Sequence, residues 1–414
     1  MISNKLLIKE VLFYFVLFCF ISCKSHKIVS SFELNNVTVD SINIEYFNSH
    51  LYLKTDIENR KVNLIFDTAA DGLYLDSVFI AKSGQKFGDL AYGKIRGAGI
   101  NEERIRIIKD SVFCKINSLN LKFNFTPILQ LRPIVGKKID GIIGNIAFRN
   151  KSIYIDYLNQ KIFVFKDFNA EMVKDFKKIS MTEINNRYFV NASITITKDI
   201  VANGKYLIDL GSGGVVSITN NAAMQNNLKN KITNQIICNS NNVGIGGNSS
   251  DTFFKSNAII LGDLVVENEH LSYSNNKTGA LSEANYLGLL GNGFFERFYV
   301  VLDFENKYLY LKRNINFKKK PKIYNLGFNY TDRTDIYNGL IVSSMFENSD
   351  AEKKGLRLGD IITHINDVSV ESMKDFSILD NTKNNQKIKI KYQRENRIQE
   401  IEIITNDLFK YVNN

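Results

Sequence analysis

The sequence predicts a chain that is mainly β, with two related β-rich lobes followed by a smaller α+β domain. Its 414 residues are too many for one ordinary core. Short alternating apolar runs, broken by Gly, Asn and Asp, dominate 32–165 and 179–313, which indicates strands. Four sequence blocks of the first segment recur in the same order in the second segment. We therefore interpret the two segments as internal repeats.

Composition predicts a folded protein and gives little sign of a charged partner. The chain is 44% hydrophobic and has a formal net charge of +10, but its Lys and Arg residues are scattered. We interpret this charge as a solvated surface, so no nucleic-acid partner is expected. The sequence has no metal-ligand spacing and no phosphate-binding loop, so no metal and no cofactor are expected.

Cys114 and Cys238 lie in different repeats and are expected to be buried free thiols rather than a disulfide.

The N-terminus is expected to be a lipoprotein signal peptide over 1–22. Lys5 and Lys9 precede an apolar run that is too short to span a bilayer comfortably. The run ends in FISC, which resembles a bacterial lipobox whose cysteine, Cys23, becomes lipidated. This resemblance implies a lipid anchor in a membrane of the bacterial cell envelope, facing the periplasm or the cell surface, with 23–31 as a tether. An uncleaved anchor and an ordinary signal peptide are the alternatives.

The remaining segments connect and follow the repeats. The stretch NAEMVKDFKK, within 166–178, is helix-like and is expected to connect the two lobes. A third domain is expected over 319–409. In it, the amphipathic segment VESMKDFSILDN precedes two strands, KIKIKYQ and IQEIEIIT.

Each repeat carries an aspartate directly after an apolar strand. NLIFDTAADGLYLD contains Asp67, and YLIDLGSGGVVSIT contains Asp209, 142 residues further on. Each is followed by a Gly-apolar-apolar-Gly segment, at 141–144 and 288–291. Two carboxylates within hydrogen-bond reach share one proton, so one can activate a water molecule while the other polarises a carbonyl.

Aspartate also caps turns, and this alternative applies to every acidic residue of the pattern. We favour turn capping for Asp156 and Asp303, and catalysis for Asp67 and Asp209, because only the latter pair lies beside the glycine segments. Asp71 is close to the first motif and is expected either to cap a turn or to raise the pKa of the pair, with capping preferred.

The doubled pattern resembles the active-site loops of aspartic proteases of the pepsin and retropepsin kind. The resemblance covers roughly residues 32 to 313 and implies two lobes of the double-ψ or closed β-barrel type, a cleft for a peptide or an unfolded protein, and catalysis by Asp67 and Asp209. It implies that the active-site loops also contain Thr68, Ala69, Leu210, Gly211 and Ser212. The segments RGAG and GIGGN resemble retropepsin flaps, with Gly97, Gly99, Gly244, Gly246 and Gly247 as the flap glycines.

Two residues depart from the family pattern. Ala69 replaces the glycine of the first loop, which is a modest change if the backbone φ there is negative. Leu210 replaces a Thr or Ser of the second loop, whose hydroxyl joins a hydrogen-bond network under the catalytic pair in the family. With Thr68 facing Leu210, this network is expected to be one-sided.

The C-terminal domain resembles a PDZ domain of the bacterial protease-associated type. The segment NLGF resembles its carboxylate-binding loop and consists of Asn325, Leu326, Gly327 and Phe328. The resemblance implies a groove that binds a C-terminal peptide as an added strand. Gly-Leu-Arg-Leu-Gly-Asp and the residues that follow resemble the next turn and strand. The alternative is a PDZ fold that only packs on the cleft.

The sequence therefore supports two hypotheses. The preferred one is an exported, lipid-anchored aspartic endopeptidase whose PDZ domain selects or regulates substrate. The alternative is a catalytically degenerate, peptide-binding lipoprotein that retains the protease cleft. Leu210 and Ala69 favour the alternative, and the two retained aspartates favour the enzyme.

Overall fold

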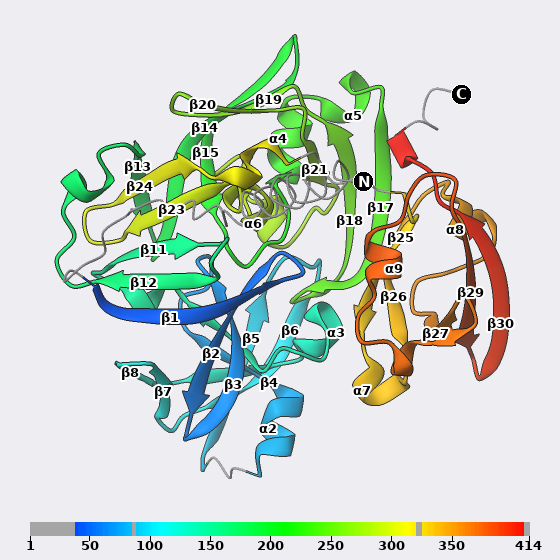
Figure 1. The fold of residues 1–414 in the computed structure, drawn as a ribbon, viewed down its shortest axis with the longest axis horizontal. Coiled ribbons are helices and arrows are strands. Elements are labelled where there is room, and N and C mark those ends of the chain that lie inside the picture. Colours follow the sequence, from blue (N-terminus) through cyan, green and yellow to red (C-terminus); the bar gives the residue numbers. More distant parts are fainter. Residues whose placement is uncertain (1–37, 85–87, 320–324, 410–414) are drawn as a thin grey trace, which may run out of the picture. The chain divides into compact units, whose positions relative to one another are not determined.

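The computed structural model describes residues 38–84, 88–319 and 325–409 (Figure 1). The predicted signal peptide, the lipidation site Cys23 and the tether lie outside the described residues. Within the described ranges, none of the helices has both the length and the apolar character needed to cross a membrane.

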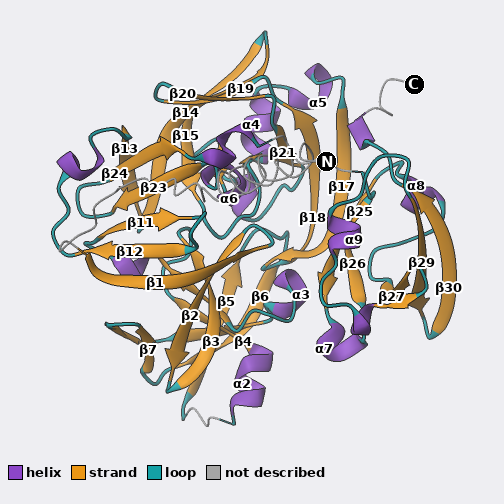
Figure 2. Cartoon of the chain, in the orientation of Figure 1, coloured by secondary structure: helices purple, strands orange, loops and turns teal. Residues whose placement is uncertain are grey.

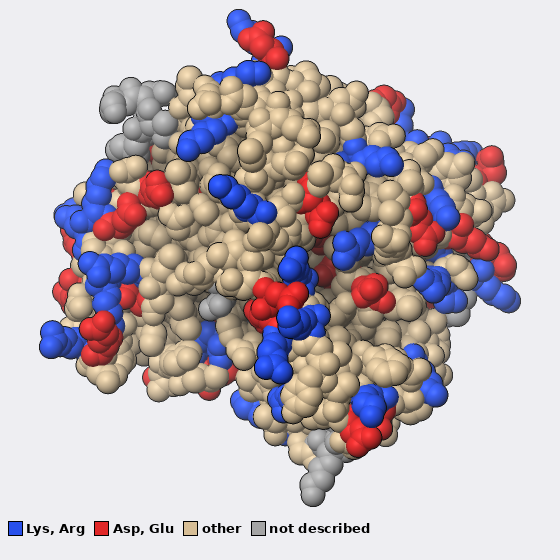
Figure 3. All heavy atoms as spheres, turned by 180° about the vertical axis from the view of Figure 1, so that it is seen from behind, with Lys and Arg blue, Asp and Glu red and all other residues tan. Residues whose placement is uncertain are grey.

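The chain is mainly β, as predicted, and its helices are short (Figure 2). On the face drawn in Figure 3, Lys and Arg side chains lie among Asp and Glu side chains, with broad areas of other residues between them. Cys114 and Cys238 are buried free thiols, which confirms that expectation.

The first β-rich segment, called lobe 1 below, begins at the first described residue. Its strands are β1 (Thr38–Phe47), β2 (His50–Ile57), β3 (Arg60–Asp67), β4 (Leu73–Asp76), β5 (Leu90–Arg96), β6 (Glu102–Ile108), β7 (Val112–Ile116), β8 (Leu119–Phe123), β9 (Thr126–Leu129), β10 (Gly141–Gly144), β11 (Ser152–Asp156) and β12 (Lys161–Phe165). Its helices are α2 (Ser77–Ser83) and α3 (Arg132–Val135).

The second β-rich segment, called lobe 2, follows a short connection. Its strands are β13 (Lys177–Ile184), β14 (Arg187–Thr197), β15 (Ile200–Ile208), β16 (Val216–Ile218), β17 (Gln235–Gly244), β18 (Gly247–Lys255), β19 (Ala258–Leu261), β20 (Leu264–Glu267), β21 (His270–Ser274), β22 (Gly288–Leu290), β23 (Phe298–Asp303) and β24 (Tyr308–Arg313). Its helices are α4 (Asn220–Gln225), α5 (Leu228–Lys231) and α6 (Asn292–Phe295).

The two lobes repeat one strand topology. In lobe 1, β10 runs parallel to β3 and antiparallel to β4, and β4 runs parallel to β9. In lobe 2, β22 runs parallel to β15 and antiparallel to β16, and β16 runs parallel to β21. The antiparallel hairpin β5–β6 joins β9, and the hairpin β17–β18 joins β21 in the same way. The internal repeat inferred from the four sequence blocks is therefore also a repeat of structure.

A six-stranded antiparallel sheet joins the lobes, in the order β1-β12-β11-β23-β24-β13. Each lobe contributes three strands. Asp156 and Asp303 are 147 residues apart, and so are Tyr154 and Val301. Tyr154 and Val301 are therefore equivalent positions in the two repeats. They also lie directly opposite each other across the β11–β23 boundary. The repeats are thus related by an approximate twofold axis that passes through this pair.

The place of each strand in its sheet explains how apolar its sequence is. All residues of β11 and β23 are buried, because these strands lie in the middle of the joining sheet. By contrast, β5 alternates between exposed and half-buried residues, as expected for a strand with one solvated face. Asp156 and Asp303 accept backbone N–H hydrogen bonds from the turns that follow β11 and β23, as the capping interpretation predicts.

The C-terminal domain has its own apolar core, which includes Phe328, Leu340, Ile362 and Ile390. Its strands are β25 (Phe328–Asp332), β26 (Leu340–Phe346), β27 (Ile361–Ile365), β28 (Val368–Ser369), β29 (Lys387–Arg394) and β30 (Arg397–Ile404), and its helices are α7 (Thr334–Tyr337), α8 (Asp350–Lys353) and α9 (Ser377–Asp380). The two strands predicted at its end are confirmed as β29 and β30.

The helix-like stretches of the sequence form less helix than expected. NAEMVKDFKK contains one 3₁₀ turn, Ala170–Val173, and then enters β13, which pairs with β24 of the joining sheet. VESMKDFSILDN forms a 3₁₀ turn, Val370–Ser372, and the four-residue α9. In the connector, strand pairing with a distant segment overrides the local helix preference.

Candidate active site

Asp67 and Asp209 occupy equivalent turns. Asp67 is the last residue of β3, and its Oδ1 accepts hydrogen bonds from the backbone N–H groups of Ala69 (2.8 Å) and Ala70 (3.2 Å). Asp209 directly follows β15, and its Oδ1 accepts from Gly211 (2.9 Å) and Ser212 (3.1 Å). In both turns, one carboxylate oxygen is held by the backbone and the other is left available.

The two turns meet across the lobes. A Cβ built on Gly211 would lie 2.4 Å from the carboxyl carbon of Asp67, so only glycine allows this approach. The side chains of Asp67 and Asp209 are hydrogen-bonded to each other. Both are half-buried, so this pair keeps some access to solvent.

The pKa values of the two carboxyl groups are raised. Burial and the negative charge of Asp67 raise the pKa of Asp209 to about 8. Burial also raises the pKa of Asp67, while the N–H groups of Ala69 and Ala70 and the charge of Arg187 oppose that rise. The two carboxyl groups therefore titrate together as a pair, and the pair keeps one proton above the usual pH range of a carboxyl group.

The network under the pair is one-sided, as expected from the sequence. The Thr68 hydroxyl donates to the carbonyl of Ile208 (2.7 Å) and accepts from the backbone N–H of Leu210 (3.0 Å). Thr68 thus binds the opposite loop twice. Leu210 is fully buried in the apolar core, so apolar packing replaces the second hydroxyl.

The other departure, Ala69, causes no backbone strain. Ala69 is not among the residues with positive φ, so the alanine adopts an ordinary backbone conformation. Its side chain packs against an apolar cluster of lobe 2 that includes Phe189 and Tyr286. The methyl group therefore adds a contact between the lobes.

Two asparagines that the sequence analysis missed fix the loops. Asn145 Nδ2 donates to the carbonyl of Thr68 (3.1 Å), and Asn292 Nδ2 donates to the carbonyl of Leu210. Both asparagines are buried, and Asn292 Oδ1 accepts from the Tyr157 hydroxyl (2.7 Å). Each follows the second glycine of its segment, in GIIGN and GLLGN, so this repeated asparagine was a readable signal.

The predicted flap glycines lie at two hairpin tips that contact each other. Gly97 and Gly99 form the tip of β5–β6, while Gly244, Gly246 and Gly247 form the tip of β17–β18. The N–H of Gly99 donates to the carbonyl of Ile245, and the N–H of Asn101 to that of Gly246, both at 3.0 Å. A Cβ on Gly99 would lie 2.2 Å from the carbonyl carbon of Gly246. Side chains at this tip would prevent the contact.

Asp71 has a different role from the two that the sequence suggested. Its carboxylate is exposed and accepts a hydrogen bond from the Tyr74 hydroxyl (2.6 Å). Turn capping was the preferred interpretation, but the Asp71 side chain instead contacts β4. This contact is possible because Tyr74 lies three residues further along the same loop and strand.

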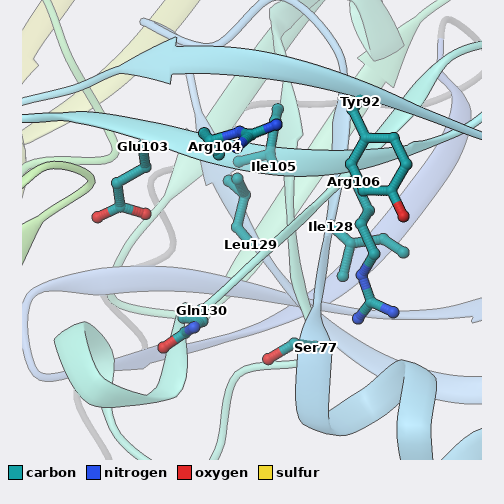
Figure 4. Close-up of a pocket in the computed structure, with 9 residues that line it drawn as sticks. All are labelled: Ser77, Tyr92, Glu103, Arg104, Ile105, Arg106, Ile128, Leu129 and Gln130. Carbon is teal, nitrogen blue, oxygen red and sulfur yellow. The ribbon is translucent and has the colours of Figure 1, made fainter.

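A hollow of about 360 Å³ lies beside the first flap hairpin (Figure 4). It is lined by Ser77, Tyr92, Glu103, Arg104, Ile105, Arg106, Ile128, Leu129 and Gln130. None of the aspartate-loop residues lines it, so it is separate from the carboxyl pair. Within the described residues, no group of three or more His, Cys, Asp or Glu side chains is arranged to hold a metal ion.

The NLGF loop leads into β25, which lies opposite α9. Gly327 has φ +87° and its carbonyl accepts from the N–H of Phe346, while Asn325 Nδ2 donates to the carbonyl of Thr382. The Tyr330 ring of β25 contacts Phe376, just before α9. The loop, β25 and α9 thus lie together in one part of the C-terminal domain.

The C-terminal domain is joined to the second flap hairpin. Strand β26 pairs with β25 on one side and with β17 on the other, through Cys238 opposite Phe346 and Ser240 opposite Ser344 (Figure 1). The N–H of Glu347 also donates to the carbonyl of Ile237 (2.9 Å). On the lobe 1 side, Arg132 forms an ion pair with Asp335.

Comparison with known proteins identifies the C-terminal domain. A sequence-family model for the PDZ domain matches residues 325–405, so the chain contains a PDZ domain there. A search among curated proteins found no match to the chain.

Replacement of Thr68 tests the link between the loops. Thr68→Val keeps the side-chain shape but leaves the Ile208 carbonyl and the Leu210 N–H unpaired, so we expect a loss of about 3 kcal/mol in the free energy of unfolding. Thr68→Ser keeps the hydroxyl and should lose only about 1 kcal/mol. Denaturant-induced unfolding measures both. Equal stability of Thr68→Val and the wild type would show that these hydrogen bonds do not join the lobes.

Proposed function

We propose that the protein is an aspartic endopeptidase, with Asp67 and Asp209 as its catalytic pair. The observation that carries this proposal is the pair of hydrogen-bonded carboxyl groups on equivalent turns of two repeated lobes. Such a pair retains one proton across a wide pH range, because the second ionisation would place two like charges in contact.

The roles of the two carboxyl groups follow from their surroundings. Ionised Asp67 takes a proton from a water molecule, and protonated Asp209 donates a hydrogen bond to the peptide carbonyl oxygen. The water oxygen then bonds to the carbonyl carbon while the Asp209 proton passes to the carbonyl oxygen, which gives a tetrahedral diol. The C–N bond breaks as the proton on Asp67 passes to the amine nitrogen and one diol hydroxyl returns its proton to Asp209, which leaves two shorter peptides and restores the pair.

The two flap tips support a closed site. Their backbone hydrogen bonds hold the β5–β6 and β17–β18 hairpins together, and the N–H of Ala280 also donates to the carbonyl of Gly97 (2.9 Å). Opening these few bonds would admit an extended peptide, and closing them would exclude bulk water from the reacting bond.

We further propose that the PDZ domain regulates this site. A peptide that adds to the edge of β25 would extend a sheet that continues through β26 into β17 and β18, the second flap hairpin. The equivalent hairpin of lobe 1 has no PDZ strand beside it among the described residues. Peptide binding would therefore act on one flap directly.

A degenerate, non-catalytic peptide-binding protein is the second candidate. The observation that favours it is the buried Leu210, which leaves only Thr68 to join the loops. Under this alternative, the cleft binds peptides and hydrolyses none.

Substitution of each aspartate tests the catalytic pair. Asp67→Asn and Asp209→Asn should each lower the turnover of an unfolded casein substrate by at least about a thousandfold, because neither variant can exchange the shared proton. Asp71→Asn, the matched control from the same loop, should retain turnover. The protein from Lys24 onward is assayed with a fluorescence-quenched substrate. Wild-type turnover in Asp67→Asn would exclude the mechanism, and no turnover in the wild type would favour the degenerate alternative.

The pH dependence of this turnover has a predicted direction. Activity requires a singly protonated pair, so kcat/KM should fall as the pH rises through about 8, where Asp209 loses its proton. It should also fall on the acid side once Asp67 is protonated. Because the pKa of Asp67 is raised above 3.8, this acid limb should lie above pH 3.8. An acid limb below that value would contradict these assignments.

A pair of peptides tests the PDZ proposal. A peptide with a free C-terminus should bind at least about tenfold tighter than its C-terminally amidated form, because the loop at Gly327 would bind the carboxylate through backbone N–H groups. Fluorescence anisotropy measures both affinities, and the free peptide should change kcat/KM for the casein substrate. Equal affinities would show that the loop does not recognise a carboxylate.

We also propose that the protein is exported and anchored through a lipid on Cys23. The support is the lipobox-like FISC after a short apolar run. In cells that express the full chain, the wild type should fractionate with membranes and Cys23→Ser should be released into the soluble exported fraction. Retention of Cys23→Ser in the membrane pellet would contradict a lipid anchor.

A further inference from the structure

Two hairpin turns with the same register extend towards the opposite lobe. The β1–β2 turn, Asn48–Ser49, pairs Phe47 with His50, and the β13–β14 turn, Asn185–Asn186, pairs Ile184 with Arg187. The four turn residues all have positive φ, between 47° and 60°. His50 and Arg187 therefore occupy equivalent positions in the two lobes, although their side chains differ in charge.

The β13–β14 turn is fixed against the first aspartate loop. Asn145 Nδ2 donates both to the carbonyl of Asn186 and to the carbonyl of Thr68, and Arg149 donates to Asn186 Oδ1. One buried asparagine thus joins the turn of lobe 2 to the loop that carries Asp67. Arg187 is the next residue after this contact.

The Arg187 side chain lies on the face of β14 whose buried residue Phe189 belongs to the cluster that contacts the first aspartate loop. In a strand, residues two apart project to the same face, so Arg187 shares a face with Phe189. Phe189 packs with Tyr286 (ring centroids 5.6 Å apart) in the cluster that contacts Ala69 of the aspartate loop. The positive charge of Arg187 also acts on Asp67 and on Tyr286, since it opposes the rise in the pKa of each.

Arg187 is an exposed cation without an ion pair to any described residue. Asp67, the carboxylate on which the charge of Arg187 acts, is already bound by two backbone N–H groups and by Asp209. The equivalent His50 is half-buried, and its Nδ1 contacts the carbonyl of Asn48 (2.7 Å). Of these two equivalent positions, only that of Arg187 presents a cation whose hydrogen-bond donors are available to a ligand.

We infer that Arg187 is a specificity-determining residue that selects peptides with a carboxylate side chain near the bond held over Asp67. This inference rests on the proposed peptide cleft. A guanidinium group binds a carboxylate through two parallel hydrogen bonds, so an Asp or Glu of the substrate fits it better than Asn, Gln or Lys. The apolar cluster under Arg187 would take a neighbouring apolar side chain of the same peptide.

A set of matched octapeptides tests this inference. The peptides share a central Leu-Phe pair and carry Glu, Gln or Lys at one of the six other positions. Cleavage by the wild type gives kcat/KM, and the Asp209→Asn variant, which mimics the protonated carboxyl, gives the dissociation constant without turnover. We expect one position at which Glu is preferred over Gln by roughly tenfold in both measurements, because a charge-assisted pair forms there.

Variants of Arg187 test whether this residue causes the preference for Glu over Gln. Arg187→Gln should remove it, Arg187→Glu should reverse it in favour of Lys, and Arg187→Lys should retain part of it. Arg397→Glu, an equal charge reversal on the exposed part of the PDZ domain, should leave it unchanged. Circular dichroism confirms that each variant is folded before the comparison.

The two series separate the inference from the proposed function. If the wild type cleaves no peptide, hydrolysis is excluded, but an Arg187-dependent difference in dissociation constants still supports the inference. The inference about Arg187 is overturned if Glu and Gln peptides bind equally at every position, if no peptide binds, or if the preference for Glu survives in Arg187→Glu.

Discussion

Two carboxyl groups in contact inside a protein carry a single negative charge at little cost, but a second charge is expensive. Asp67 and Asp209 are under this constraint, since they are hydrogen-bonded to each other and burial raises both pKa values. The surrounding structure keeps the two carboxyl groups in contact by holding their loops in fixed positions. Each carboxylate accepts two backbone N–H groups, and each loop carbonyl accepts from a buried asparagine.

The joining sheet makes this contact possible. The approximate twofold axis through Tyr154 and Val301 relates the lobes, so two equivalent turns meet face to face. Symmetry is broken at particular residues with different consequences. Leu210 provides apolar packing where the family pattern has a hydroxyl, and Arg187 is an exposed cation at the position that His50 occupies in lobe 1. Strand β26 of the PDZ domain pairs with β17 of lobe 2 and not with the equivalent strand of lobe 1, β5. The carboxyl pair is thus symmetric in position, while its surroundings are not.

The sequence predicted those features that depend on local pattern or on repetition. The repeat and the turns at Asp67 and Asp209 could be read because blocks recur in order, and the mainly β class could be read from alternating apolar runs. The one-sided Thr68 network and the PDZ domain could be read from the resemblance of short motifs to known families. The connector could not be read correctly, because pairing of β13 with β24 decides its conformation. Contacts between Asn145 and Asn186, and between β17 and β26, join residues far apart in the chain, and no periodicity in the sequence indicates them. The proposal that the lobes form a protease is supported by the resemblance and by the geometry of the pair.

Neutron diffraction from deuterated crystals at about pH 6 would show whether Asp67 and Asp209 share one proton and together activate water. We expect one deuteron between the carboxyl groups, oxygen atoms within ~3 Å of each other, and one water molecule that contacts both side chains. Two ionised carboxylates, or oxygen atoms more than about 6 Å apart with separate water molecules, would contradict this expectation.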